Sequence, residues 1–232
     1  MVPVPPGAKV WLVTGCASGL RREVVVAALA HGDCVIATAR NPERLADLEK
    51  KGAWTLALDV TASQDELSAV VTHALGVYGT IDVLVNNAAY LLEGAIEECR
   101  EYNTNVFGML RVLRAVLPHM REKRSGVVAN VGSAGGWKGI PGIGLYGSTK
   151  FAIAGITLAL REEVAPLGIE VTVPLTTHVA SFSGKQPGDP AKAAQLMDAV
   201  KLGQCVLKQN KRELDEWAEL AGSTDFADAS KP

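Results

Sequence analysis

Short apolar runs alternate with longer amphipathic stretches along most of the chain, up to Val173. Each run is rich in β-branched residues and is flanked by turn residues, which is typical of strands buried in a parallel sheet. These runs are residues 9–14, 34–39, 53–59, 81–86, 127–131 and 169–173. Their alternation with helical stretches predicts an α/β fold built from strand–helix–strand units.

The stretches between these runs carry apolar residues at helical spacing. Helices are expected at residues 23–31, from 41 onward, from 63 onward, at about 96–122 and at 146–165. Ser63 and Glu66 have the spacing of a capping box, and Gly32 is placed to end the first helix. Beyond Val173 the pattern weakens, and only residues 191–202 and 208–221 are expected to be helical.

Composition narrows the class of protein. The 232 residues are 48% hydrophobic, which suffices for the core of one domain over residues 1–232. The net charge of −2 comes from interspersed acidic and basic residues, so nucleic acid is not an expected partner. Widely spaced cysteines and histidines predict reduced thiols and no metal site. Without a signal sequence or a long apolar run, a cytoplasmic protein with no membrane contact is expected.

A glycine-punctuated turn follows the first predicted strand and reads Thr14-Gly15-Cys16-Ala17-Ser18-Gly19-Leu20-Arg21. Small residues at a strand-to-helix turn let backbone amides approach a pyrophosphate, and the helix N-terminus adds partial positive charge. By itself such a turn is weak evidence, because glycine-rich turns often serve only chain reversal.

Further motifs follow in a fixed order: Thr14-Gly15-(x)3-Gly19, Asp59-Val60, Asn86-Asn87-Ala88, Ser133 and Tyr146-(x)3-Lys150. Together, over residues 9–173, they resemble the short-chain dehydrogenase/reductase family. The resemblance implies a Rossmann-type, doubly wound parallel sheet in three α/β/α layers. It also implies an oxidoreductase that interconverts a carbonyl and an alcohol of a small molecule by hydride transfer.

The resemblance assigns the catalytic roles to residues in the second half of the chain. Tyr146 and Lys150 share one helix face, and a neighbouring ammonium would pull the phenol pKa down toward working pH, so that Tyr146 acts as acid and base. Ser133 would hold and polarise the substrate oxygen, and Asn105 would hold a water for proton relay. Alternatively, each could be structural, and Asn105 could mark a helix kink or a polar contact.

The resemblance also implies a dinucleotide site. Its expected residues are Thr14, Gly15, Ser18, Gly19, Leu20, Arg40, Asp59, Val60, Asn86, Ala88, Tyr146 and Lys150. Arg40 follows the second strand where NAD-specific proteins carry a carboxylate, so NADP(H) is expected to be preferred over NAD(H). Asp59 is expected to contact the adenine, although an aspartate after a strand is also a common turn residue.

The chain departs from the family pattern at several places. Arg21 replaces the third glycine of the turn; an outward side chain could assist phosphate binding, and an inward one would lower cofactor affinity. Ala89 replaces another glycine. The stretch between Asn87 and Asn105 is short, and residues 174–232 form a shortened substrate region with C-terminal helices and no convincing seventh strand.

These departures leave alternatives open. The first hypothesis is the active NADP(H)-dependent enzyme, and it rests on the complete Ser133, Tyr146 and Lys150 set. The second is a catalytically impaired nucleotide-binding or scaffold protein that keeps the fold. A lyase or isomerase using the same tyrosine is a third. The family resemblance also implies a homo-oligomer formed through the two long helices.

Overall fold

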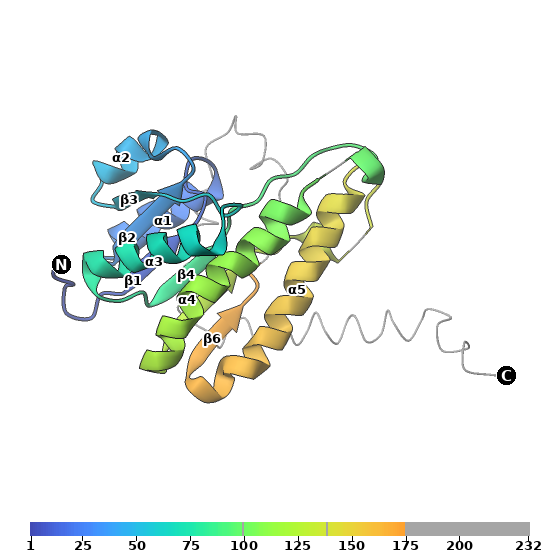
Figure 1. The fold of residues 1–232 in the computed structure, drawn as a ribbon. Helices are drawn as coiled ribbons and strands as arrows, with labels where there is room; N and C mark the ends of the chain where they lie inside the picture. Colours follow the sequence, from blue (N-terminus) through green and yellow to red (C-terminus); the bar gives the residue numbers. More distant parts are fainter. Residues whose placement is uncertain (99, 138, 175–232) are drawn as a thin grey trace.

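A parallel sheet forms the centre of the structure, a computed structural model that describes residues 1–98, 100–137 and 139–174 (Figure 1). Its strands are β1 (Val10–Val13), β2 (Cys34–Ala39), β3 (Trp54–Ala57), β4 (Val83–Asn86), β5 (Gly126–Asn130) and β6 (Ile169–Thr172). They are arranged in the order β3-β2-β1-β4-β5-β6 with every neighbouring pair parallel. The order reverses between β1 and β4, which confirms the predicted Rossmann-type, doubly wound sheet.

Helices cover both faces of this sheet. The longer ones are α1 (Leu20–Ala30), α3 (Gln64–Tyr78), α4 (Met109–Lys123) and α5 (Gly144–Val164). The shorter ones are η1 (Pro42–Leu45), α2 (Ala46–Glu49), η2 (Ile96–Glu98), the π-helix η3 (Asn103–Gly108), η4 (Ala134–Gly136) and η5 (Ala165–Leu167). Apolar side chains of α3, α4 and α5 pack on one face, and those of α1, η1 and α2 pack on the other. The predicted three-layer arrangement is therefore confirmed.

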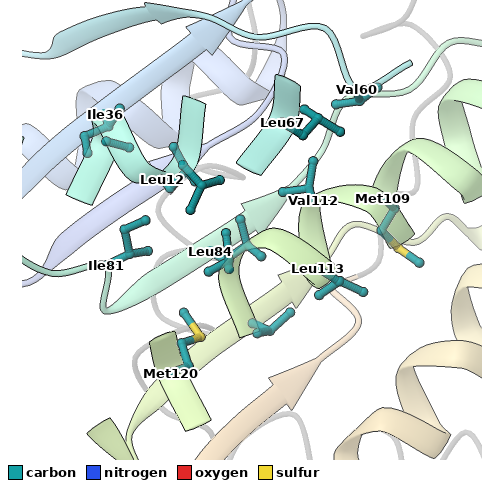
Figure 2. Packing of buried hydrophobic residues seen from close by; sticks show 14 of the residues in the cluster. Leu12, Ile36, Val60, Leu67, Ile81, Leu84, Met109, Val112, Leu113 and Met120 are labelled. Carbon is teal, nitrogen blue, oxygen red and sulfur yellow. The ribbon is translucent and has the colours of Figure 1, made fainter. Parts of the chain in front are cut away.

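The larger of the two core clusters lies under α3 and α4 (Figure 2). Leu12 and Leu84 project from β1 and β4 and meet Leu67 of α3 and Val112 of α4 in this cluster. Successive residues of a strand point to opposite faces, so Trp11 packs in the second cluster with α1. Burial on both faces explains why the strands read as continuous apolar runs.

Local signals place the helix ends correctly. The Ser63 hydroxyl accepts a hydrogen bond from the backbone N–H of Glu66, and the Glu66 carboxylate accepts one from the N–H of Ser63, so the predicted capping box forms at the start of α3. Gly32 follows the end of α1 with a φ of 91°, a conformation that side-chain-bearing residues rarely adopt.

One predicted helix is wrong in extent. The helix expected over residues 96–122 is instead η2, then irregular chain, then the π-helix η3, with α4 beginning only at Met109. Ile96 is 65% exposed, so the apolar spacing at that end does not describe a buried face. Within η3, the side chain of Asn105 bonds the backbone of Tyr90 and thereby favours an irregular turn over a regular helix.

Two expectations concern residues beyond this description. The helices expected at residues 191–202 and 208–221, with the rest of the shortened substrate region, lie outside the described residues. Among residues 1–98, 100–137 and 139–174, no helix combines the length and the apolar content that crossing a bilayer requires.

Candidate active site and cofactor crevice

The predicted site residues gather at the carboxyl edge of the sheet. Thr14 follows β1, Asn86 ends β4, and Ser133 lies just after β5. Tyr146 and Lys150 lie in the first turns of α5, next to the chain that leaves β5. A crevice at the point where strand order reverses is where doubly wound folds bind their ligands.

Ser133, Tyr146 and Lys150 lie together at one corner of this edge. Ser133 makes a side-chain hydrogen bond to the Tyr146 phenol, and Lys150 Nζ lies 5.7 Å from the centre of the Tyr146 ring. Lys150 Nζ also donates a 2.8 Å hydrogen bond to the carbonyl oxygen of Val131, at the end of β5. All three side chains are buried, so each is held in place by surrounding protein.

Burial dominates the electrostatics of Tyr146. It raises the pKa of the phenol above its usual value, and the charge of Glu101 raises it further. The hydrogen bond from Ser133 and the positive charge of Arg21 act in the opposite direction without reversing the shift. The sequence interpretation expected a lowered pKa, and the net direction in the protein alone is the reverse because desolvation outweighs the favourable charges.

Lys150 is perturbed in the opposite sense. Burial lowers its pKa to about 7, and the positive charge of Arg21 adds to the shift. A buried ammonium is costly, and here it donates to one backbone carbonyl rather than to a carboxylate. At neutral pH the Lys150 amine can therefore take up or release a proton.

Asn105 makes the polar contact that the sequence left as an alternative. It is almost fully buried within η3; its Oδ1 accepts from the Tyr90 N–H, and its Nδ2 donates to the Tyr90 carbonyl and to Thr149 Oγ1 at 3.2 Å. The amide thus ties the chain after β4 to α5. It also lines a small cavity of about 10 Å³ beside Lys150, close to the volume that one water needs.

The glycine-rich turn has the tight geometry that the sequence predicted. Gly15 has a φ of 74°, and a Cβ there would lie 3.0 Å from the Cα of Ala88. Gly19, with a φ of 69°, caps α1, which begins at Leu20 directly after Ser18 and Gly19. Thr14 Oγ1 accepts hydrogen bonds from the N–H groups of Asn87 and Ala88 and so fixes this turn against the end of β4.

Arg21 points inward, toward the turns after β1 and β4. Its Nη2 donates a 2.7 Å hydrogen bond to the Ala89 carbonyl, and its Nη1 donates a 3.3 Å bond to the Gly15 carbonyl. The two carbonyls belong to the turns after β4 and β1, on either side of the point where strand order reverses. Burial lowers the pKa of Arg21, whereas the neighbouring Cys16 and Tyr146 raise it.

Arg40 and Asp59 follow β2 and β3, on the other side of β1 from the catalytic corner. Arg40 is exposed after β2, with its charge close enough to act on Asp59. Partial burial raises the pKa of Asp59, but hydrogen bonds from Thr61 and the charge of Arg40 hold it below its usual value. Oδ1 of Asp59 accepts hydrogen bonds from the N–H and the hydroxyl of Thr61, so Asp59 has the turn role that the sequence left as an alternative. Val60 is buried against Gly108.

The residues between these two groups fit a dinucleotide. Asn86 Oδ1 and Asn87 Nδ2 are buried without a hydrogen-bond partner among the described residues. Both asparagines line the small cavity, together with Ala88 and Ala89. A buried amide atom without a partner is costly, so polar groups of a ligand would stabilise this wall. Arg21 fits a dinucleotide less well, because its side chain lies against the turns after β1 and β4, where the pyrophosphate would bind.

Two residues of the site escaped the sequence interpretation. Glu101 is fully buried, and its Oε1 accepts a hydrogen bond from the Leu92 N–H. Its neighbours Glu97, Glu98 and Arg100 are also charged, a pattern that is typical of a solvated face and not of a buried residue. Gly136 packs against Lys150, and a Cβ there would lie 2.7 Å from the Lys150 Cβ. A run of two glycines after Ser133 was the available signal.

Comparisons with known proteins agree with this geometry. Residues 9–187 match the short chain dehydrogenase family. Oxidoreductase BOA17 of Botryotinia fuckeliana is 41% identical over 176 residues, which cover 71% of this chain and 64% of that protein. The chain therefore spans slightly less than two thirds of the length of this curated relative.

Solved structures show the same fold. A short-chain dehydrogenase from Streptomyces avermitilis is 36% identical, with a TM-score of 0.73 over 95% of this chain and 100% of that one. The structure of ElxO with NADP bound is 29% identical, with a TM-score of 0.65 over 72% of each chain. The family match, the sheet order and the placement of Ser133, Tyr146 and Lys150 together show that the chain belongs to the short-chain dehydrogenase/reductase family of oxidoreductases.

Proposed function

We propose that the protein is an NADP(H)-dependent oxidoreductase that interconverts a carbonyl and an alcohol of a small molecule, with Tyr146 as the acid and base. The observation that carries the proposal is the cluster of Ser133, Tyr146 and Lys150, with a hydrogen bond between the first two and 5.7 Å from the Lys150 Nζ to the Tyr146 ring centre. A protein that only binds nucleotides has no chemical need for this cluster.

Each residue of the cluster has one role in the proposal. The bound nicotinamide supplies or accepts the hydride. Tyr146 donates its phenolic proton to the substrate oxygen as the alcohol forms, and Ser133 donates a hydrogen bond that polarises the same oxygen. Lys150, with a pKa of about 7, returns a proton to the phenolate from the buried side. Asn105 positions this corner by holding the Tyr90 backbone against Thr149 of α5.

The raised pKa of Tyr146 favours the protonated phenol, which is the form that carbonyl reduction uses. A phenol whose pKa lies above its ordinary value of 10 keeps its proton at neutral pH and can serve as a donor. Alcohol oxidation requires the phenolate and should therefore increase toward alkaline pH.

The remaining parts of the proposal rest on charge and on relatives. Arg40 offers a guanidinium fork to a 2′-phosphate, and ElxO, a relative in structure, has been solved with NADP bound. A cytoplasmic homo-oligomer is proposed on the family resemblance. The exposed Phe107 and Phe151, on η3 and α5, support a contact between copies of the chain.

The test is a turnover assay with a panel of ketones and aldehydes, following oxidation of NADPH. Tyr146→Phe removes the proton donor and should lower kcat about 10²- to 10⁴-fold. Tyr78→Phe, at the end of α3 and far from the crevice, is the matched control and should retain full activity. Equal activity of the two variants would contradict the role of Tyr146.

Cofactor choice is tested by titrating NADPH and NADH against Arg40→Ala. Loss of a charged phosphate contact should weaken NADPH binding about tenfold and leave NADH binding unchanged. Arg44→Ala removes another exposed arginine from the adjacent η1 and should alter neither affinity. A wild-type protein that binds NADH as tightly as NADPH would refute the preference.

A second candidate is supported by the bridge that Arg21 forms between the Gly15 and Ala89 carbonyls. A protein with this crevice obstructed could bind nucleotide without efficient turnover and act as a scaffold. Binding of NADPH without oxidation on any substrate of the panel would favour this candidate.

A further inference from the structure

The side chain of Arg21 lies where the two halves of the sheet meet. Its guanidinium joins the carbonyl oxygens of Gly15, after β1, and Ala89, after β4, at 3.3 and 2.7 Å. A Cβ on Gly15 would come within 3.4 Å of the Arg21 Nη1, so the guanidinium lies directly against the glycine-rich turn. No acidic side chain pairs with Arg21 among the described residues.

The position of the guanidinium along the crevice follows from its electrostatic neighbours. Its charge acts on Cys16, in the glycine-rich turn, and on Tyr146 and Lys150, at the catalytic corner, whereas Arg40 is the arginine whose charge acts on Asp59. Coulomb interactions weaken with distance, and the guanidinium bonds the Gly15 and Ala89 carbonyls, so Arg21 lies between the glycine-rich turn and the catalytic corner. A dinucleotide that extended from Arg40 to Tyr146 would pass the glycine-rich turn, against which the Arg21 guanidinium lies.

We infer that Arg21 divides the cofactor crevice, closing its nicotinamide end in the free protein while leaving the adenosine 2′-phosphate end open. This inference rests on the proposed function, since it concerns the binding of the same NADP(H). The complete dinucleotide binds only when the guanidinium leaves the Ala89 and Gly15 carbonyls and turns outward. A ligand that consists of the adenosine portion alone binds without this displacement.

The neighbouring arginine provides a matched control. Arg22 lies in the same turn of α1, but its guanidinium forms an ion pair with Asp47 of α2, away from Ala89. Arg22→Ala therefore removes the same side chain from the same helix without opening the nicotinamide end. Arg21→Ala keeps the helical propensity of α1, and Arg21→Gly is the second variant, which restores the smaller residue.

The experiment measures two affinities for each variant of the full chain. NADPH binding is followed by nicotinamide fluorescence, and binding of adenosine 2′,5′-bisphosphate is followed by calorimetry. Arg21→Ala should tighten NADPH binding about tenfold, which corresponds to about 1.4 kcal/mol, and should change adenosine 2′,5′-bisphosphate binding by less than about twofold. Arg22→Ala should not tighten NADPH binding.

The outcomes separate this inference from the proposed function. Wild-type protein that binds NADPH, with affinity unchanged or weakened in both Arg21→Ala and Arg21→Gly, would overturn the inference alone and would make Arg21 a phosphate ligand or a structural clamp. Failure of wild-type protein and both variants to bind either ligand would overturn the inference together with the proposed function.

Discussion

Lys150 carries a charge that its surroundings oppose. Its side chain is 3% exposed, and burial lowers its pKa to about 7 from an ordinary value of 10.5. Between these two values the unfolded chain holds a proton that the folded protein has released. Stability contributed by this residue therefore rises as pH increases from about 7 toward 10.5, and the folded protein is most penalised below pH 7.

Replacing Lys150 by Met should expose this linkage. Methionine does not titrate, so the free energy of unfolding of the wild type should rise relative to that of the variant by about 2–3 kcal/mol between pH 6 and pH 9. Urea unfolding of both proteins across that range, without cofactor, measures the difference. A difference that does not vary with pH would show that Lys150 keeps its ordinary pKa.

Gly136 supports Lys150 by having no side chain. A Cβ at this position would lie 2.7 Å from the Lys150 Cβ and 2.9 Å from its carbonyl carbon, and backbone atoms cannot move aside cheaply. Gly136→Ala should therefore destabilise the protein by about 1–3 kcal/mol and lower turnover by displacing Lys150. Gly139→Ala meets no atom within 4 Å and is the matched control. Thermal unfolding and turnover that match for the two variants would disprove the packing argument.

Among the elements, η3 contributes both a buried apolar residue, Val106, and the site residue Asn105. It is a π-helix that places Asn105 against Tyr90 and Thr149, while Asn103, two residues earlier, is exposed and accepts hydrogen bonds from Arg111. A single wide turn of this kind is often found at functional sites, where it redirects one side chain out of the regular helical pattern.

Two asparagines of η3 allow a paired test. Asn105→Ala leaves the Tyr90 N–H and carbonyl without their partner, so it should cost about 1–3 kcal/mol of stability and lower kcat. Asn103→Ala removes only exposed contacts and should lie within about 0.5 kcal/mol of the wild type. Chemical denaturation together with steady-state kinetics measures both effects. An Asn105→Ala variant as stable and active as Asn103→Ala would contradict the positioning role.

The elements also show what sequence can and cannot predict. All six strands appear where apolar β-branched runs indicated them. A strand that is buried on both faces is a continuous apolar run, which can be recognised without any alternation of polar and apolar residues. The helix expected at 96–122 is wrong because Asn105 is held by a residue fifteen positions earlier, a contact that no local pattern reveals. The inward position of Arg21 and the burial of Glu101 likewise depend on neighbours distant in sequence. The motif residues themselves could be located because their spacing is specific.

For the whole molecule, the proposed cofactor would contact both halves of the sheet. The chain after β1, β2 and β3 supplies the glycine-rich turn, Arg40 and Asp59, and the chain after β4 and β5, with α5, supplies the catalytic corner. A ligand that contacts both halves opposes their separation, so binding should stabilise the fold as one unit.

NADPH at a hundredfold excess over its Kd should raise the free energy of unfolding by about 2.7 kcal/mol. Tryptophan fluorescence and circular dichroism should report the same shift in midpoint, because the four tryptophans include Trp11 in the centre of the sheet. NADH at the same concentration should give a smaller shift. Two optical signals that shift by different amounts would indicate that the halves unfold separately.

Cys16 gives the glycine-rich turn a chemical reporter. The thiol is fully buried and donates to the Val13 carbonyl, and burial raises its pKa to about 12, whereas Cys34 on β2 is partly exposed. The thiolate is the form that attacks an alkylating reagent, so we expect Cys16 to react only after the turn opens, and Cys34 serves as an internal reference. The alkylation half-life of Cys16, measured for its peptide by mass spectrometry, therefore reports how often the glycine-rich turn opens.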